Sequence, residues 1–321
     1  MDRVLNHRGI VNAETERKVL EIAKLLDYQP NKAGIALAAQ KKKLKIGVLL
    51  FGAESVFDEV MDGLRQKLEE LSIYGCTVIE RRISFDLQSQ LQTIDELLKE
   101  EIHGLILSPY NDPAIQEKID LLWENGIPCI TINTDMPDSK RIAYVGSDYH
   151  KCGQTAAGLL HLFSGDYASV GIVTGSHNVL CHEERISGFT SHLHTKHPNI
   201  RIVDVVENGD DDYKSYEVVS DLLDRHPDLS ALYFTAAGVY GGCRAVLNAS
   251  LQRPLKIITF DAVLSTCEMI RNGVISATIC QQPDEQGARS LSLLVDYLLT
   301  GKLPENRCIY MDLSIKIAEN L

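Results

Sequence analysis

The sequence predicts an α/β protein with two doubly wound parallel-sheet lobes that follow an all-helical N-terminal segment. From Lys45 onward, short apolar runs alternate with longer amphipathic stretches, a pattern typical of parallel strands joined by helices. About five predicted strands precede Lys151 and four follow it, too many for one compact sheet with a short crossover at each step. Roughly the first 40 residues, by contrast, show only helical patterns and turns. Two side-by-side lobes therefore fit the pattern better than a single sheet.

The predicted strands are the short apolar runs, and the predicted helices are the stretches between them. We expect strands at Ile46 to Phe51, Thr77 to Ile79, Gly104 to Ser108, Cys129 to Asn133, Ala143 to Gly146, Ser169 to Thr174, Ile202 to Val206, Ala231 to Thr235 and Lys256 to Phe260. We expect helices at Glu54 to Leu71, Gln88 to Glu100, Ala114 to Trp123, His150 to Leu162 and His182 to His194. Later elements, which could complete either lobe, are a strand at Ala277 to Cys280, a helix at Glu285 to Leu299 and a last strand at Cys308 to Leu313.

Size and composition favour two ordinary globular domains. The chain has 321 residues, of which 45% are apolar, so each lobe can bury its own core. The opening residues lack a basic segment followed by an apolar stretch, and no later run approaches the roughly 18 apolar residues of a membrane span. Eight scattered cysteines include no CxxC pair, so we expect mostly buried free thiols and neither a disulfide nor a structural metal. We expect a soluble, cytoplasmic protein.

Charge is unevenly distributed along the chain. The formal net charge is -12, but the segment from Met1 to Lys45 holds ten Lys/Arg against five Asp/Glu, near +5, which leaves the remainder near -17. Only the N-terminal segment is therefore suited to contact phosphate. For the lysines at positions 41, 42, 43 and 45, a solvated linker is the competing interpretation.

Polar side chains follow several of the predicted strands. In open parallel sheets, ligands bind beyond the carboxyl ends of the strands, where loops and helix N-termini converge. Residues expected at these ends are Ser55 and Phe57 after the first strand, Ser108, Asn111 and Asp112 after the third, Asn133 and Asp135 after the fourth, Asp148 after the fifth, and Arg185, Thr235, Asp261 and Gln281 in the second half. Each could instead be a helix cap or turn residue, but their shared location favours a polar pocket. Carboxylates, amides, one arginine and the nearby Phe57, Tyr110 and Tyr149 suit a polyhydroxylated ligand such as a sugar.

The N-terminal segment contains ordered motifs. A helix that starts at Asn12 is followed, after Pro30, by a second, short helix. The motifs are Arg3-Val4-Leu5-Asn6, Val11-Asn12-Ala13-Glu14-Thr15 and Leu26-Asp27-Tyr28-Gln29-Pro30-Asn31, and in the body Tyr144-Val145-Gly146-Ser147-Asp148, Glu184-Arg185-Ile186-Ser187-Gly188-Phe189, Thr259-Phe260-Asp261 and Thr278 to Gly287. In order and spacing they resemble the LacI/GalR family of transcriptional regulators, over essentially the whole chain.

The resemblance implies a domain plan. Residues 1–28 would be a partial helix-turn-helix headpiece, residues 29–43 a hinge helix and linker, and residues 44–321 an effector-binding core of the type I periplasmic-binding-protein-like class. Lobe 1 would comprise about 44–160 plus 282–306, and lobe 2 about 161–281 plus 307–321. No residues of this sequence correspond to the front of the family's recognition helix. To explain this difference, we favour a start codon assigned too late over a shortened chain or a natural variant.

The resemblance also implies functional residues. DNA contacts would fall on Arg3, Asn6, Asn31, Lys32 and Leu37, with Leu37 as a wedge in the minor groove or packed between paired hinge helices. Effector contacts would fall on Asp148, Arg185, Asp261 and Gln281, which agrees with the strand-end residues. One departure is Thr235-Ala236, where the family commonly has an Asn-Asp pair.

The function implied is a homodimeric, ligand-responsive regulator, expected to be a repressor, that binds operator DNA if its headpiece is complete. Replacing Arg185 with alanine should then abolish ligand-induced stabilisation while leaving the cores intact. The alternatives are a transport-type sugar-binding protein and a ligand sensor that does not read DNA sequence.

An enzyme is not expected, nor is a cofactor. The glycine-rich stretch from Gly238 to Gly242 is neither a Walker loop nor a dinucleotide fingerprint. Five histidines lie in one region, but solvated helix and loop positions are a better interpretation than metal ligands or catalytic bases. These histidines are His177, His182, His192, His194 and His197.

Overall fold

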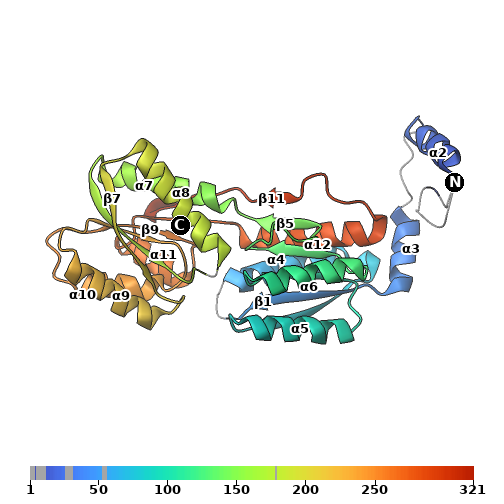
Figure 1. Ribbon diagram of the computed structural model, residues 1–321, viewed down its shortest axis with the longest axis horizontal. Helices are drawn as coiled ribbons and strands as arrows, with labels where there is room; N and C mark the ends of the chain where they lie inside the picture. Colours follow the sequence, from blue (N-terminus) through green and yellow to red (C-terminus); the bar gives the residue numbers. More distant parts are fainter. Residues whose placement is uncertain (1–3, 5–11, 26–31, 53–55, 178) are drawn as a thin grey trace.

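The structure, a computed structural model, consists of two α/β lobes that lie end to end, with helical segments beyond the first lobe (Figure 1). It describes residues 4, 12–25, 32–52, 56–177 and 179–321. Each lobe contains one sheet of six strands, in the orders β11-β5-β4-β3-β1-β2 and β12-β10-β9-β8-β6-β7. The fold class predicted for the two lobes is confirmed.

The sheet of lobe 1 is parallel throughout. Its strands are β1 (Lys45–Phe51), β2 (Thr77–Ile83), β3 (Gly104–Leu107), β4 (Cys129–Ile132), β5 (Ala143–Gly146) and β11 (Cys308–Tyr310). The short central strands β3, β4 and β5 are buried along their whole length. Helices on both faces explain why these strands are apolar runs rather than alternating patterns.

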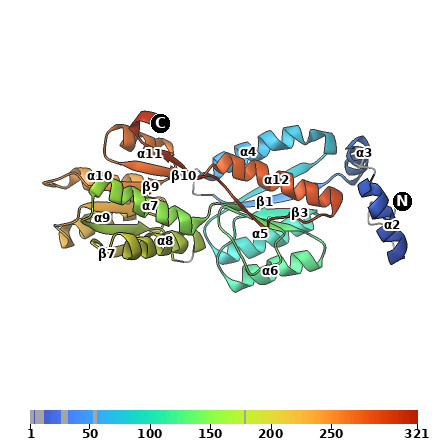
Figure 2. The same ribbon diagram turned by 90° about the horizontal axis from the view of Figure 1, so that it is seen from above.

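Two helices cover each face of this sheet (Figure 2). They are α4 (Val56–Glu70) and α12 (Pro283–Thr300) on one face, and α5 (Leu87–Lys99) and α6 (Pro113–Glu124) on the other; a short 3-10 turn, η1 (Ser72–Tyr74), follows α4. Helices α4 and α12 touch backbone to backbone, since a Cβ on Gly63 would lie 1.9 Å from the Asp284 carbonyl oxygen. Asp86 and Asp112 cap α5 and α6 by accepting backbone N–H bonds, as expected for aspartate at a helix start.

Lobe 2 repeats this architecture with one antiparallel edge strand. Its strands are β6 (Ala168–Thr174), β7 (Ile200–Glu207), β8 (Ala231–Phe234), β9 (Lys256–Phe260), β10 (Ala277–Cys280) and β12 (Ser314–Lys316). Its helices are α7 (Tyr149–Ser164) and α8 (Leu180–Lys196) on one face, α9 (Asp212–Arg225), α10 (Val239–Asn248) and α11 (Leu264–Arg271) on the other, and the terminal 3-10 turn η2 (Ala318–Asn320).

Two expected lobe boundaries are wrong. Helix α7, expected in lobe 1, packs on α8 and on strands of lobe 2. Within the stretch Cys308 to Leu313, expected as one strand in lobe 2, only Cys308–Tyr310 forms a strand, β11, and it joins the sheet of lobe 1. The next strand, β12 (Ser314–Lys316), joins the sheet of lobe 2. The chain thus crosses between the lobes after β5, after β10 and after β11. Sequence periodicity cannot detect such a division, because it does not show which sheet a short strand joins.

Helices α2 (Ala13–Leu25) and α3 (Lys32–Lys42) lie in the described part of the chain before the first lobe. Asn12 caps α2, since its side-chain oxygen accepts the Glu14 N–H at 2.9 Å. Helix α3 contacts lobe 1, where Gln40 donates to the Ile73 carbonyl at 2.9 Å. In the described part of the chain, no helix has both the length and the apolar character that crossing a membrane requires.

Candidate functional site

A cavity of about 210 Å³ lies where the carboxyl ends of the two sheets face each other, and both lobes line it. Lobe 1 contributes Phe51, Val56, Phe57, Phe85, Ser108, Asn133 and Thr134, and lobe 2 contributes Val179, Cys181, His182, Arg185, Asp210, Asp212, Ala236, Ala237, Gly238, Val239, Phe260, Asp261, Val263 and Gln281. Pockets for drug-sized ligands occupy roughly 300–1,000 Å³. This cavity therefore suits a smaller molecule.

Arg185 lies on the first turns of α8 and is 4% exposed. Its guanidinium carbon lies 3.8 Å from the Phe260 ring centroid and 4.8 Å from that of Tyr149. One terminal nitrogen donates to the Thr235 carbonyl. Stacking between two aromatic rings stabilises the buried charge and fixes the direction in which the remaining N–H groups point.

His182, one turn before Arg185, is also buried in the cavity wall, at 6% exposed. Its Nδ1 lies 3.2 Å from both the backbone N and the carbonyl oxygen of Ser176. Burial, and after it the Arg185 charge, lower the pKa of His182 to about 3. The imidazole is therefore neutral at physiological pH and can offer a ligand a donor or an acceptor without a charge.

Asp261 and Gln281 form a pair at the ends of neighbouring strands β9 and β10. The Gln281 amide nitrogen donates to both carboxylate oxygens, at 2.9 and 3.0 Å. Desolvation raises the pKa of Asp261, against the opposing effects of Arg185 and Gln281. Asp261 has a φ of 61°, an uncommon conformation for a residue with a side chain. Strained backbone of this kind clusters at functional sites.

On the opposite wall, lobe 1 presents Ser108, Asn133 and Thr134. Gln90 holds the loop after β3, because its side chain donates to the Ser108 carbonyl at 2.9 Å and accepts the Tyr110 N–H at 2.8 Å. Asn133 has a φ of 64°. Its carbonyl oxygen accepts from the Tyr144 hydroxyl at 2.9 Å. The polar ends of β3 and β4 are thus held rigidly toward the cavity.

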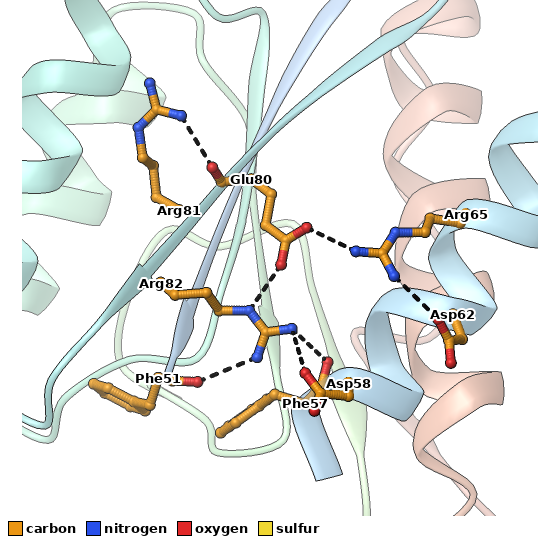
Figure 3. A network of polar contacts seen from close by, with 8 residues as sticks. All are labelled: Phe51, Phe57, Asp58, Asp62, Arg65, Glu80, Arg81 and Arg82. Atoms are coloured by element: carbon orange, nitrogen blue, oxygen red, sulfur yellow. Dashed lines mark hydrogen bonds and ion pairs between the residues drawn. The ribbon is translucent and has the colours of Figure 1, made fainter. Parts of the chain in front are cut away.

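Arg82, on the edge strand β2, organises the aromatic side of the cavity (Figure 3). It donates to the Phe51 carbonyl at 3.4 Å and to the Phe57 carbonyl at 3.0 Å. It also pairs with Asp58 at 3.2 Å and Glu80 at 2.8 Å. The guanidinium therefore ties the end of β1 to the first turn of α4, where two lining phenylalanines lie.

Four buried side-chain atoms in this wall have no hydrogen-bond partner among the described residues. They are Ser108 Oγ, Thr134 Oγ1, Arg185 Nε and Gln281 Oε1. An unpaired buried polar atom costs roughly 1–3 kcal/mol. A polar ligand that pairs with these atoms would recover that free energy, so the wall is suited to bind one.

Six of the ten predicted effector residues line the cavity: Phe57, Ser108, Asn133, Arg185, Asp261 and Gln281. Three others lie elsewhere. Asp135 forms a buried ion pair with Arg141, Asp148 caps α7, and the Thr235 hydroxyl donates to Thr174 at 2.7 Å. The tenth, Ser55, lies outside the described residues.

The predicted DNA-contact residues are described only in part. Arg3, Asn6 and Asn31 lie outside the described residues, and Lys32 begins α3. Leu37 is 60% exposed on α3, so its side chain is accessible to a partner.

Sequence reasoning missed four polar residues of the cavity, Thr134, His182, Asp210 and Asp212. Asp210 lies in the short loop after β7 and Asp212 begins α9, so the strand-end argument could have found both. His182 had no such signal, because only the packing of α8 distinguishes it from the solvated histidines nearby. Within the described ranges, no group of three His, Cys, Asp or Glu side chains could hold a metal ion.

A cavity shared by two α/β lobes defines a two-lobed ligand-binding protein. Residues 46–303 match the family model described as a periplasmic binding protein domain, and the chain belongs to this family.

Relatives fall into two groups. The chain is 26% identical over 266 residues to the ribose import binding protein RbsB of Bacillus subtilis (strain 168), covering 83% of this chain and 85% of that protein. It is 25% identical over 310 residues to catabolite control protein A of Staphylococcus aureus (strain MRSA252), covering 95% and 90%. Both transport-type binding proteins and regulators are therefore among its relatives.

Solved structures share the same fold. A solute-binding protein from Burkholderia graminis C4D1M in complex with D-arabinose superposes with a TM-score of 0.81 at 22% identity, covering 86% of this chain and 96% of that one. A putative LacI transcriptional regulator from Bacteroides fragilis superposes with a TM-score of 0.78 at 22% identity, covering 87% and 98%.

Proposed function

We propose that the chain is a ligand-responsive transcriptional regulator whose two lobes bind a sugar or a related small polyhydroxylated molecule. The proposal that the lobes bind a polyhydroxylated ligand rests on the cavity wall, where four buried polar atoms are unpaired among the described residues. Hydroxyl groups can act as donors and acceptors at once, so a polyol matches this mixture. Phe57 and Phe260 supply apolar surface for the C–H faces of a sugar ring.

The regulator part is supported by the N-terminal segment. The alignment with catabolite control protein A covers 95% of this chain, so it must extend into the segment before β1, where α2 and α3 lie. That segment carries most of the chain's clustered positive charge, as expected for a surface that contacts phosphate.

The mechanism we propose is a coupling of two equilibria in a homodimer. A ligand that contacts both lobes favours the closed arrangement, and closure changes where the N-terminal segments lie. The change in DNA affinity is limited by the difference between the ligand's affinities for the open and the closed arrangement. No catalytic step is part of this proposal.

The first test is a thermal-shift screen of the purified chain against pentoses, hexoses, their phosphates and nucleosides. We expect a selective rise in melting temperature, since a ligand at 100 times its Kd stabilises by about 2.7 kcal/mol. The absence of a shift with every compound would count against a polyol-binding site.

The second test is selection of DNA fragments from a random library at physiological salt, with and without that ligand. A chain with a complete headpiece should select fragments whose affinity changes with ligand, whereas the present sequence, without the front of the recognition helix, should bind DNA only weakly and with strong salt dependence. A chain that binds the ligand but selects no fragment in either condition would instead support the transport-type function of its other relatives, or a sensor without DNA recognition.

A further inference from the structure

Two aspartates of lobe 2, Asp210 and Asp212, form what we call the acidic corner of the cavity. Asp210 Oδ1 accepts the Ala237 N–H at 3.1 Å, and Asp212 Oδ1 accepts the Gly241 N–H at 2.9 Å. The other carboxylate oxygen of each has no hydrogen-bond partner in the described part of the chain. Both carboxylates are thus held in place by one oxygen while the second stays available.

The backbone around the acidic corner is shaped to hold it. Asp210 has a φ of 60°, and its N–H donates to the Asn208 side chain at 2.9 Å. A Cβ on Gly175 would lie 2.4 Å from either Asp210 carboxylate oxygen, so the missing side chain leaves room for that carboxylate. Asn208 also donates to the Ala237 carbonyl at 2.8 Å, which joins this loop to the one before α10.

The charges of the wall do not balance. Among the described lining residues, Arg185 is basic, whereas Asp210, Asp212 and Asp261 are acidic and His182 is neutral. Arg185 is already engaged by the Thr235 carbonyl and by Phe260. The described lining side chains therefore carry a formal net charge near -2, and Arg185 is the one basic residue among them. Outside the lining, Lys214 Nζ lies 3.7 Å from where a Cβ on Gly209 would stand.

Burial makes the charge of Asp210 costly, whereas Asp212 is exposed. Desolvation raises the pKa of Asp210, and Arg185 lowers it only in part. An anionic ligand would add to the repulsion, whereas a cation would relieve it. Arg185 Nε and Gln281 Oε1, both buried and unpaired within the described residues, indicate independently that a polar ligand fills the same space.

We propose that the ligand of this cavity carries an ammonium group, which binds at the acidic corner, together with hydroxyl groups that pair with the rest of the wall. The inference rests on the proposed function, because it names the chemical class of the same ligand. Amino sugars and amino polyols are the compounds of this class that fit a cavity of about 210 Å³.

The test compares matched compounds by calorimetric titration: D-glucose, D-galactose and D-ribose, their amino-deoxy derivatives and their phosphate esters. We expect at least one amino compound to bind tenfold or more tightly than its neutral parent, which corresponds to about 1.4 kcal/mol. Phosphate esters should not bind. Equal or tighter binding of the neutral parent, or of a phosphate ester, would overturn the inference.

Two isosteric variants sharpen the test. Asp210→Asn keeps the oxygen that accepts from the Ala237 N–H but removes the charge. It should therefore lower the affinity for the amino compound at least tenfold, and the affinity for the neutral parent less than about threefold. Asp211→Asn is the matched control, since Asp211 caps α9 and does not line the cavity. Equal losses in both variants, or no loss in Asp210→Asn, would contradict the role of the acidic corner.

The outcomes separate the two proposals. If neutral or anionic sugars bind and Arg185→Ala abolishes their binding, the polyol site stands and only the ammonium inference fails. If no compound of any charge binds, both fail.

Discussion

At the scale of single residues, His182 should make the protein sensitive to acid. The pKa of His182 is lowered to about 3 in the folded state, against about 6.5 in an unfolded chain. Between these values the unfolded chain binds a proton that the folded protein does not, so stability is lost as pH falls.

We expect the loss of unfolding free energy between about pH 7 and about pH 5 to be smaller by about 2 kcal/mol in His182→Asn than in the wild type. Urea unfolding at the two pH values measures this. If both proteins lose the same free energy, the neutral state of His182 is not what the acid sensitivity depends on.

Arg185 should matter for stability as well as for binding. Sequence reasoning expects Arg185→Ala to leave the cores intact, but the structure buries this side chain between Phe260 and Tyr149. We expect Arg185→Ala to lower the free energy of unfolding by roughly 1–3 kcal/mol, because the Thr235 carbonyl loses its donor, and to abolish the ligand-dependent rise in melting temperature. If the variant keeps the ligand-dependent rise in melting temperature, Arg185 is not needed for ligand binding.

Asp135, a predicted effector residue, should instead be structural. It pairs through both carboxylate oxygens with Arg141, and Arg141 also donates to the Arg307 carbonyl at 3.3 Å, next to β11. Asp135→Asn leaves a buried guanidinium without its counter-charge. We expect a loss of about 3 kcal/mol in chemical denaturation with the ligand Kd unchanged. A higher ligand Kd with an unchanged free energy of unfolding would instead indicate that Asp135 takes part in ligand binding.

At the scale of elements, the contact between α7 and α8 positions Arg185. A Cβ on Gly153 of α7 would lie 2.1 Å from the Arg185 carbonyl oxygen and 2.6 Å from the Phe189 nitrogen. Gly153→Ala must therefore separate the helices, which we expect to cost about 1–3 kcal/mol and to weaken ligand binding.

Gly158 offers the matched control on the same helix. A Cβ there meets nothing within 4 Å, so Gly158→Ala should stabilise α7 by roughly 0.5–1 kcal/mol and leave ligand binding unchanged. Thermal melts of both variants with and without ligand make the comparison. Similar effects of the two substitutions would mean that the close helix contact does not position Arg185.

The elements themselves show where sequence patterns are informative. Three strands, Ala143–Gly146, Lys256–Phe260 and Ala277–Cys280, match their predicted bounds, and the other buried strands differ from theirs by one residue. The prediction works because a strand covered on both faces is a continuous apolar run. Strand β2 was predicted to end at Ile79 but continues to Ile83. Its second half, from Glu80 to Arg82, is polar because it lies at the sheet edge and carries the ion pairs of Figure 3.

At the scale of the whole molecule, the charge distribution predicts how DNA binding should depend on salt. The segment from Met1 to Lys45 is near +5 and the rest of the chain near -17. We expect removal of residues 1–43 to abolish DNA binding while the ligand-dependent thermal shift stays. For the full chain, the logarithm of DNA affinity should fall linearly with that of salt concentration. DNA binding that survives removal of the segment would place the phosphate contacts elsewhere.

The sequence by itself determined the two-lobed α/β class, most strands and helices, and six of the side chains that line the cavity. It could do so because local hydrophobic periodicity and the position of polar residues at strand ends are properties of neighbouring residues. The tertiary structure alone decided that α7 belongs to lobe 2, that β11 and β12 join different sheets, that Asp135 pairs with Arg141, and that His182 is buried beside Arg185. These outcomes depend on contacts between residues far apart in the chain, which no local pattern encodes.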